Sequence, residues 1–374
     1  MRLSFLFALP VLWPALAGAK SEPPPPLPPV HVTLRVDASS GDASAWKIAV
    51  TNDGDVPVRL AADARLLTLE IQPPEGASAP EPKTGAKAGK VKPPETVVCK
   101  LPSPLRPTTV VDDRALILAP GARYEESVSP LLYCFDLRSA RAFSAGATVV
   151  AKLGFPPPPA RGPKKATQDA PFVAEPSVRD ASVSPIKELV ADPIVVSRGI
   201  AVPDDGGRNV SDSSTPSQDQ RAAHLQLSAP ARIEADTELT VGISFIVKNV
   251  GERGATVHIR RDNFLFDVDG PDGVNHCGNA ANLRLVPQEL FYVMKPGASQ
   301  SLDVWVGEMC PDVVFDRAGL YRVWPTLAFP NTTKELGVDS WTEPLRAKEP
   351  VLVRILRGRL PFYAEPPHAI GSAG

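Results

Sequence analysis

Short runs of alternating apolar and polar residues recur along the chain. Apolar residues occupy every second position in residues 32–36, 46–50, 67–71 and 264–268, and the positions between them are mostly polar. A period of two places the apolar side chains on one face of a β-strand. Segments such as NDG, PPEG, GPDG and PGA separate the runs and predict turns. No long amphipathic helical pattern is present, so the sequence predicts an all-β fold.

The order of these runs is the same in both halves of the chain. HVTLRV precedes WKIAVTNDGDVPVRL, as HLQL precedes ISFIVKNVGERGATVHI, and Asn52 then corresponds to Asn249. LAPGARYEESV matches MKPGASQSLDV, and FSAGATVVAKLGFP is parallel to FDRAGLYRVWPTLAFP. A series of landmarks in one order predicts an internal duplication. Several short antiparallel strands in each copy favour a β-sandwich.

The repeat also predicts how the cysteines pair. The chain has four cysteines, and each half holds an early one and a late one, the late one at the same distance from the PGA turn. Two disulfides are therefore expected, each closing a loop of about 35 residues and worth roughly 3–4 kcal/mol in the chain-entropy model. Zinc is disfavoured because no Cys-x-x-Cys pair is present. The expected pairs are Cys99 with Cys134 and Cys277 with Cys310.

At these motifs the chain resembles bacterial extracytoplasmic immunoglobulin-like domains. The resemblance is carried by VTNDGDVPV and VKNVGERGATV as an early hairpin, by the PGA turn before a mid-domain strand, and by AGLYRVW as a late strand. It covers both halves and implies two tandem immunoglobulin-like antiparallel β-sandwich domains. The cysteines do not frame a central tryptophan as in antibody domains. Such sandwiches have many functions, so the resemblance implies no activity.

The N-terminus MRLSFLFALPVLWPALAGAK predicts a signal peptide that is cleaved after Ala19. The alternative is a retained anchor helix, which Pro10 and Pro14 disfavour. No cysteine follows the cleavage region, so the usual bacterial lipid-attachment signal is missing, and no later segment approaches the ~20 apolar residues of a membrane-spanning helix. We therefore expect an extracytoplasmic protein, periplasmic or secreted. The net charge of −2 gives no attraction to nucleic acid.

Composition divides the rest of the chain. Proline is abundant, at 43 of 374 residues, and it is concentrated in segments with few large apolar side chains. Such segments cannot bury much surface and are expected to lie outside the sandwiches. The predicted organisation is a signal peptide (1–19), a proline-rich stem (20–30), domain 1 (31–202) with disordered insertions near 77–95 and 156–172, a polar linker (203–222), domain 2 (223–360) and a C-terminal tail (361–374).

The stretch FDVDGPDGVNHCG, residues 266–278, has the densest set of possible metal ligands. It could be a calcium loop, a zinc site or a turn between strands. The calcium-loop pattern Asp-x-Asp-x-Asp-Gly fails because Pro271 stands at the third ligand position. GPDG has the proline and glycine of a tight turn. We predict a strand, a turn and a disulfide here and no metal site, with calcium on Asp267, Asp269 and Asp272 as the alternative.

No catalytic motif is present in the sequence. There is no His-Glu-x-x-His, no Gly-x-Ser-x-Gly and no phosphate-binding loop, and His31 and His224 begin matching strands, which indicates structural roles. Trp324 and Trp341 could form an aromatic platform for sugars or pack in the fold. Two triplets fit glycosylation acceptors, at Asn209 and Asn331.

These observations predict a non-catalytic binding or structural protein without catalytic residues, cofactors or metal. Its expected partner is a protein or polysaccharide of the cell envelope. The alternative is an enzyme or accessory domain acting on extracellular or cell-wall carbohydrate, which needs paired carboxylates ~5–10 Å apart in a cleft. A calcium-stabilised adhesin is a third hypothesis.

Overall fold

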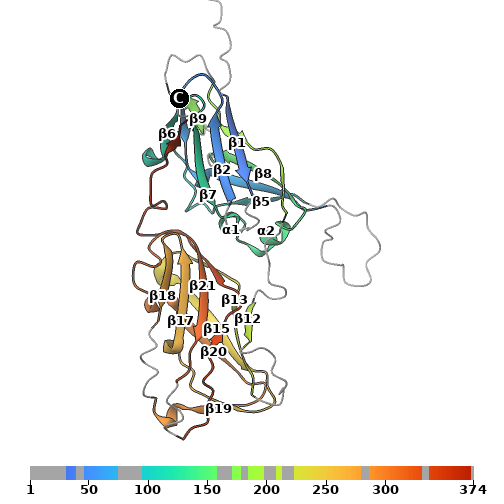
Figure 1. Ribbon diagram of the computed structural model, residues 1–374, viewed down its shortest axis with the longest axis vertical. Helices are drawn as coiled ribbons and strands as arrows, with labels where there is room; N and C mark the ends of the chain where they lie inside the picture. Colours follow the sequence, from blue (N-terminus) through green and yellow to red (C-terminus); the bar gives the residue numbers. More distant parts are fainter. Residues whose placement is uncertain are drawn as a thin grey trace, which may run out of the picture.

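A computed structural model describes most of the chain in two lobes. The first lobe comprises described residues up to 197 together with the C-terminal segment 361–371, and the second comprises described residues from 208 to 360 (Figure 1). The described residues are 31–38, 46–74, 95–157, 171–177, 184–197, 208–212, 223–278, 286–330 and 337–371.

The predicted signal peptide and stem lie outside the described residues. So do nearly all of the two predicted insertions. Most of the predicted linker is also outside them, but Arg208–Asp212 within it form a strand that pairs with Gln226–Pro230. This strand differs from the polar coil expected there, because the backbone of a polar segment can still satisfy the open edge of a sheet.

The first lobe is built from two main sheets and one small sheet. One main sheet has the order β1-β2-β7-β24, the other has the order β10-β8-β4-β5 with β11 also on β8, and the small sheet has the order β6-β3-β9. The strands are β1 (Val32–Asp37), β2 (Trp46–Asn52), β3 (Val58–Ala61), β4 (Leu67–Gln72), β5 (Val97–Lys100), β6 (Ala115–Leu118), β7 (Arg123–Val128), β8 (Thr148–Gly154), β9 (Ala174–Pro176), β10 (Glu188–Val190), β11 (Ile194–Val195) and β24 (Ala369–Ile370).

The second lobe repeats this plan. Its main sheets have the orders β12-β13-β15-β20 and β14-β23-β21-β17-β18, with β22 also on β21, and β16 pairs with β19. All of these pairs are antiparallel except β14 with β23. The strands are β12 (Arg208–Asp212), β13 (Leu225–Pro230), β14 (Arg232–Ala235), β15 (Gly242–Asn249), β16 (Ala255–Val257), β17 (Phe264–Gly270), β18 (Gly273–Cys277), β19 (Tyr292–Met294), β20 (Ser299–Trp305), β21 (Gly319–Leu327), β22 (Leu345–Arg346) and β23 (Val351–Ile355).

Helices are few and short. The α-helices are α1 (Pro130–Tyr133), α2 (Leu137–Ala142) and α3 (Val306–Met309), and single 3-10 turns are η1 (Ala64–Leu66), η2 (Asp112–Arg114), η3 (Glu238–Thr240), η4 (Arg261–Asn263) and η6 (Gln288–Leu290). Among the described residues, no helix has the length and apolar content needed to cross a bilayer. The protein is thus nearly all β, as the alternating pattern predicts.

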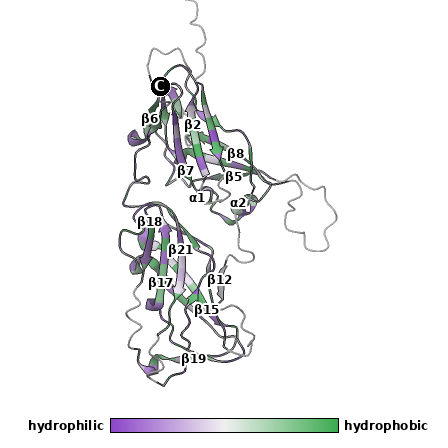
Figure 2. Ribbon diagram, viewed as in Figure 1, coloured by the Kyte–Doolittle hydropathy of each residue, from purple (hydrophilic) through white to green (hydrophobic). Residues whose placement is uncertain are grey.

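Each lobe buries its own core between its sheets. The apolar residues of β2 and β4 point inward in alternation, as do Phe264, Phe266 and Val268 of β17, which confirms the strands expected from the period of two. Figure 2 shows this alternation as green and purple bands along the strands. Burial of these apolar faces, at about 25 cal/mol per Å², is the main stabilising contribution to both lobes.

One buried asparagine organises the same turn in each lobe. Asn52 donates to the carbonyl oxygens of Val56 at 2.8 Å and Leu118 at 3.0 Å, and it accepts from the amide of Gly54 at 3.1 Å. Asn249 donates to Arg253 O at 2.7 Å and to Met294 O at 2.9 Å, and it accepts from the amide of Gly251 at 3.0 Å. A buried amide needs such partners, so this residue fixes the turn and the neighbouring strand together.

Each lobe has one disulfide, which ties an edge strand to the end of a short helix. Cys99 on β5 is bonded to Cys134 after α1, and Cys277 on β18 is bonded to Cys310 after α3. These are the pairs expected from the repeated spacing. Each link joins an outer strand to the segment that leads into the late strand of its own lobe.

The C-terminal segment, residues 361–371, returns from the second lobe to the first. In Figure 1 it runs from the lower lobe along the upper lobe and ends beside β6 and β9. Its strand β24 adds to β7, with Ala369 opposite Tyr124 and Ile370 opposite Arg123. The segment predicted as a C-terminal tail is therefore part of the first lobe's sheet.

Candidate functional site

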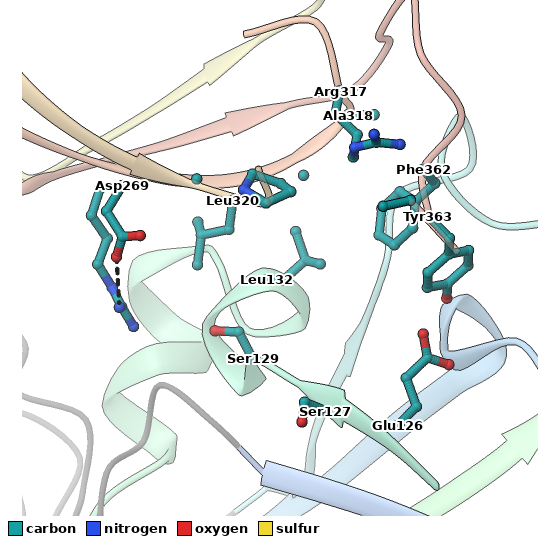
Figure 3. Close-up of a pocket in the computed structure, with 15 residues that line it drawn as sticks. Glu126, Ser127, Ser129, Leu132, Asp269, Arg317, Ala318, Leu320, Phe362 and Tyr363 are labelled. Atoms are coloured by element: carbon teal, nitrogen blue, oxygen red, sulfur yellow. Dashed lines mark hydrogen bonds and ion pairs between the residues drawn. The ribbon is translucent and has the colours of Figure 1, made fainter. Parts of the chain in front are cut away.

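A cavity of about 420 Å³ lies between the two lobes and is closed on one side by the C-terminal segment (Figure 3). The first lobe contributes residues from β7 and α1, and the second contributes the β17–β18 turn and the start of β21. The lining residues are Glu126, Ser127, Ser129, Leu132, Asp269, Gly270, Pro271, Arg317, Ala318, Gly319, Leu320, Arg322, Phe362, Tyr363 and Ala364.

Tyr363 anchors the C-terminal segment in the first lobe. Its hydroxyl donates to Asp63 Oδ1 at 2.9 Å and accepts from the amide of Arg65 at 3.1 Å. The guanidinium carbon of Arg114 lies 3.7 Å from the centroid of the Tyr363 ring, a cation–π contact. Burial, together with the charges of Glu126 and Asp63, raises the pKa of Tyr363 well above its ordinary value, so the hydroxyl stays protonated and remains a donor.

Asp63 holds the residues on which Tyr363 packs. Its carboxylate caps η1 by accepting from the amide of Arg65 at 3.0 Å, and it accepts from the Arg65 side chain at 3.0 Å (Nε) and 2.7 Å (Nη2). The guanidinium of Arg65 in turn faces the rings of Phe362 and Tyr363, at 5.4 and 5.3 Å from their centroids. The bidentate pair fixes the plane of the guanidinium and thus the surface that receives the two rings.

Glu126 is the most perturbed carboxyl group in the cavity wall. It lies on β7, its side chain is 16% exposed, and Arg114 Nη2 donates to its Oε2 at 2.7 Å. The hydroxyl of Tyr124 also donates to this oxygen. Burial raises the pKa of Glu126 to about 7, although Arg114 acts in the opposite direction. Figure 3 shows the carboxyl group pointing toward Tyr363.

The charged side chains from the second lobe are paired across its own sheet. Arg317 Nε donates to Asp272 Oδ1 at 3.0 Å, and its Nη1 donates to the carbonyl oxygen of Pro361. Arg322 Nη1 donates to Asp269 Oδ2 at 3.4 Å. Arg317 therefore links the β17–β18 turn to the start of the C-terminal segment and orients that segment as it leaves the second lobe.

Two further arginines bind the first lobe beside the cavity. Arg354 Nη1 on β23 donates to Leu132 O at 3.0 Å, and its guanidinium carbon lies 4.3 Å from the Phe135 ring centroid. Arg232 Nη1 on β14 donates to Phe135 O at 2.6 Å. These carbonyl groups belong to α1 and the residues after it, where a helix leaves acceptors without internal partners. The second lobe supplies the missing donors.

This arrangement has the chemistry of an interface. The titratable groups that line the cavity each have a partner of opposite type: Glu126 with Arg114 at 2.7 Å, Arg317 with Asp272 at 3.0 Å, and Asp269 with Arg322 at 3.4 Å. The exceptional feature is the pKa of Glu126, which lies near neutrality.

The acidic stretch singled out in the sequence forms a strand, a turn and a strand. Phe266 and Val268 are buried while Asp267 is exposed, as expected, and Gly270 pairs with Gly273 across a two-residue turn. Asp267, Asp269 and Asp272 each pair with a different side chain, namely His276 at 2.6 Å, Arg322 and Arg317. Among the described residues, no three His, Cys, Asp or Glu side chains gather as a metal site requires.

The histidines singled out at the starts of strands have matching structural roles. The carbonyl oxygen of His31 accepts from the amide of Asp53 at 2.8 Å, and that of His224 accepts from the amide of Val250 at 2.7 Å. His258 is buried, with Nδ1 3.3 Å from Leu290 O. Each of these three therefore serves the fold of its own lobe.

The two tryptophans considered as a sugar platform are held within the second lobe. Trp324 stands on β21 opposite Asp267. Trp341 packs against the core, and its Nε1 donates to Glu343 O at 2.7 Å. Of the predicted glycosylation acceptors, Asn209 lies on β12 and Asn331 lies outside the described residues.

Sequence reasoning missed Asp63, Arg65, Arg114, Glu126 and Tyr363. Asp63 and Tyr363 are separated by 300 positions and belong to no motif. The sequence does contain one signal: PFYAEPPHAI places two aromatic residues in the segment predicted to be a C-terminal tail. Aromatic residues in such a segment commonly find a surface on which to pack.

Comparison with known proteins identifies no family. No protein-family model matches the chain, and no curated protein matches it. Among solved structures, the chain aligns with a bacterial adhesin from Mobiluncus mulieris that contains intramolecular disulfide, isopeptide and ester bond cross-links. The alignment has 9% identity and a TM-score of 0.12, and it covers 92% of this chain and 97% of that chain. Likeness at this level defines neither a shared fold nor a function.

Proposed function

We propose that this chain is a non-catalytic extracytoplasmic protein with binding or structural roles, built from two immunoglobulin-like sandwiches that arose by duplication. The repeated asparagine turn, the two equivalent disulfides and the left-handed glycines Gly121 and Gly297 in matching PGA turns support the duplication. The disulfides favour an oxidising compartment.

One observation carries the proposal. The charged groups around the cavity hold the lobes together through the C-terminal segment, with Tyr363 inserted among Asp63, Arg65 and Arg114. Such an arrangement produces a two-lobed unit with a set orientation, which suits a spacer or a receptor for an envelope partner. The partner class is a protein or polysaccharide of the cell envelope, without nucleic acid, metal or cofactor.

Two assays test this function. The purified mature chain should show no turnover on a panel of cell-wall and extracellular polysaccharides, esters and peptides, and it should retain a specific partner when used as bait in an extracytoplasmic extract. Robust turnover that disappears on replacement of one side chain contradicts the proposal.

An enzyme or accessory module acting on carbohydrate is the second candidate. The supporting observation is that Glu126, with a pKa of about 7, and Asp269 line the same cavity. A carboxyl group with this pKa can serve as a general acid. Turnover that is lost in Glu126→Gln but kept in Glu125→Gln, a change on the same strand where Glu125 pairs with Arg123 at 3.1 Å, would favour this candidate.

A further inference from the structure

The first lobe shows how this sandwich accepts an added strand. Ala369 and Ile370 of β24 pair antiparallel with Tyr124 and Arg123 at the outer edge of β7, and β24 lies beside β6. β24 thereby lies along the gap between β6 and β7, although Ile117 on β6 is still 61% exposed. Ala122, at the start of this edge, is buried, and so is Tyr124.

The second lobe has the same gap between β19 and β20. Asn52 donates to Leu118 O at the end of β6, and Asn249 donates to Met294 O at the end of β19. The amide of Gly121 donates to Asn52 O, and the amide of Gly297 donates to Asn249 O, both at 2.8 Å. Through these bonds β19 corresponds to β6, and β20 corresponds to β7.

In the second lobe, no strand among the described residues lies along this gap, and the Tyr292 hydroxyl on β19 donates to Gln300 Oε1 on β20. The gap forms a groove of about 450 Å³ that is lined by Tyr292, Val293, Met294, Lys295, Ala298, Ser299 and Gln300. Within the part of the chain that the structure describes, β15 is the only strand that pairs with β20. Ala298 and Gln300, which correspond to the buried Ala122 and Tyr124, are both partly exposed.

The groove offers both a backbone edge and apolar surface. Asn249 N donates to Ala298 O, and Lys248 stands opposite Ser299, so the alternation of an antiparallel ladder directs the N–H of Ser299 away from β15. Beside this edge, Val293 on β19 lines the groove and is 61% exposed. An unpaired edge with adjacent apolar side chains is suited to pairing with an extended segment.

We propose that the groove between β19 and β20 binds an extended strand of a partner protein, added antiparallel to β20 as β24 is added to β7. The partner strand has free N–H groups at its pairing residues and small or β-branched apolar side chains, like the Ala369–Ile370 pair. The proposal rests on the equivalence of the two lobes and does not depend on the absence of catalysis.

The protein's own C-terminal strand is not the expected occupant. It is held on the first lobe by Tyr363 and by its pairing with β7. In addition, β19 lies at the end of the second lobe that is farthest from the first (Figure 1). That position leaves the groove accessible to another protein.

A peptide of residues 365–371, EPPHAIG, is the probe, because this sequence pairs with the equivalent edge in the first lobe. Its binding to the full mature chain is followed by fluorescence anisotropy of a labelled copy. Ser299→Pro removes the outward N–H at the first residue of β20, where proline is tolerated, and should weaken binding at least ~10-fold. Ser299→Ala keeps the N–H and should bind as the unaltered chain does.

Two further variants locate the site. Val293→Asp adds a charge to the exposed groove wall and should also weaken binding. Arg123→Pro changes the corresponding first-lobe edge and should leave binding unchanged. Absence of binding, equal binding by Ser299→Pro and Ser299→Ala, or loss in Arg123→Pro alone overturns the proposal. Sedimentation that shows self-association abolished by Ser299→Pro also overturns it, by identifying a second copy as the occupant.

Discussion

The hydroxyl of Tyr363 donates to Asp63 Oδ1 at 2.9 Å across a sequence separation of 300 residues. The C-terminal segment is held at both ends of the short stretch from Pro361 to Tyr363. Arg317 of the second lobe donates to Pro361 O, and the rings of Phe362 and Tyr363 then pack against Arg65 of the first lobe. The C-terminal segment therefore joins the two lobes, in addition to the direct bonds from Arg354 to Leu132 O and from Arg232 to Phe135 O.

Removal of the Tyr363 hydroxyl should destabilise the first lobe. In Tyr363→Phe a charge-assisted hydrogen bond is lost, and we expect a decrease of about 2 kcal/mol in the free energy of unfolding. In Tyr363→Ala the buried ring is lost as well, and we expect about 3–5 kcal/mol. Urea denaturation followed by far-ultraviolet circular dichroism measures both. Tyr292→Ala, at a tyrosine that is 39% exposed and whose hydroxyl donates to Gln300 Oε1, is the comparison and should cost less, and an equal loss there contradicts this role of Tyr363.

Arg354 should fix the orientation of the lobes. Arg354→Ala removes the bond to Leu132 O and the contact with the Phe135 ring, and we expect a loss of about 1–3 kcal/mol because a carbonyl group at the end of α1 is left without its donor. Spin labels on the two lobes should report a broader distance distribution. Arg357→Ala removes an exposed pair with Asp236 and serves as control. An unchanged distribution in Arg354→Ala contradicts the prediction.

Stability should depend on pH through Glu126. Its pKa rises from 4.5 to about 7 on folding, so its stabilising contribution is complete below pH 4.5 and is lost as the pH rises through 7. Glu126→Gln mimics the protonated group. The quantity to measure is the free energy of unfolding of the wild type minus that of this variant. This difference should fall by about 3 kcal/mol as the pH rises from 4.5 to above 7. A difference that stays flat, or rises, over this range rejects the assignment.

Loss of either disulfide should destabilise its lobe. The two disulfides join cysteines that are 35 and 33 residues apart in the sequence. For loops of this length the chain-entropy model gives a stabilisation of about 3–4 kcal/mol each. The double replacements Cys99→Ala with Cys134→Ala, and Cys277→Ala with Cys310→Ala, should each lower the melting temperature of one calorimetric transition. If both double replacements lower the melting temperature of one shared transition, the lobes unfold as one cooperative unit. The expectation of separate effects is then wrong.

Calcium should not bind the acidic turn. Asp267, Asp269 and Asp272 point to His276, Arg322 and Arg317, and calcium would have to displace these partners. We expect a flat isothermal titration and no change in melting temperature on addition of calcium. Heat release that disappears in Asp269→Asn would establish the calcium-stabilised alternative.

The sequence predicted the strands well because their pattern is local. Ile48, Val50, Leu69 and Phe266 alternate with polar residues, and a half-buried strand requires this period wherever it lies in the lobe. The disulfide pairs followed from comparing the two halves, since equivalent spacings place equivalent cysteines together. The turn at Pro271 was likewise a local property of proline and glycine.

The cavity could not be predicted in the same way. Glu126 follows Glu125 in the sequence with nothing to mark it, and its raised pKa depends on burial by elements far along the chain. Arg354 lies in a strand that looks like any other, and its partner carbonyl is 222 residues away. The groove beside β20 is visible only by contrast with its counterpart beside β7, to which β24 is added.

The sequence by itself determined the all-β character, the strand positions and the cysteine pairing, because each depends on alternation or on spacing within a short range. Tertiary structure alone decided that residues 361–371 complete the first lobe, that Asp63 meets Tyr363, and that, among the described strands, only one of two equivalent edges has an added strand. These features depend on which surfaces remain uncovered after the strands have paired, and no local pattern of residues encodes that outcome.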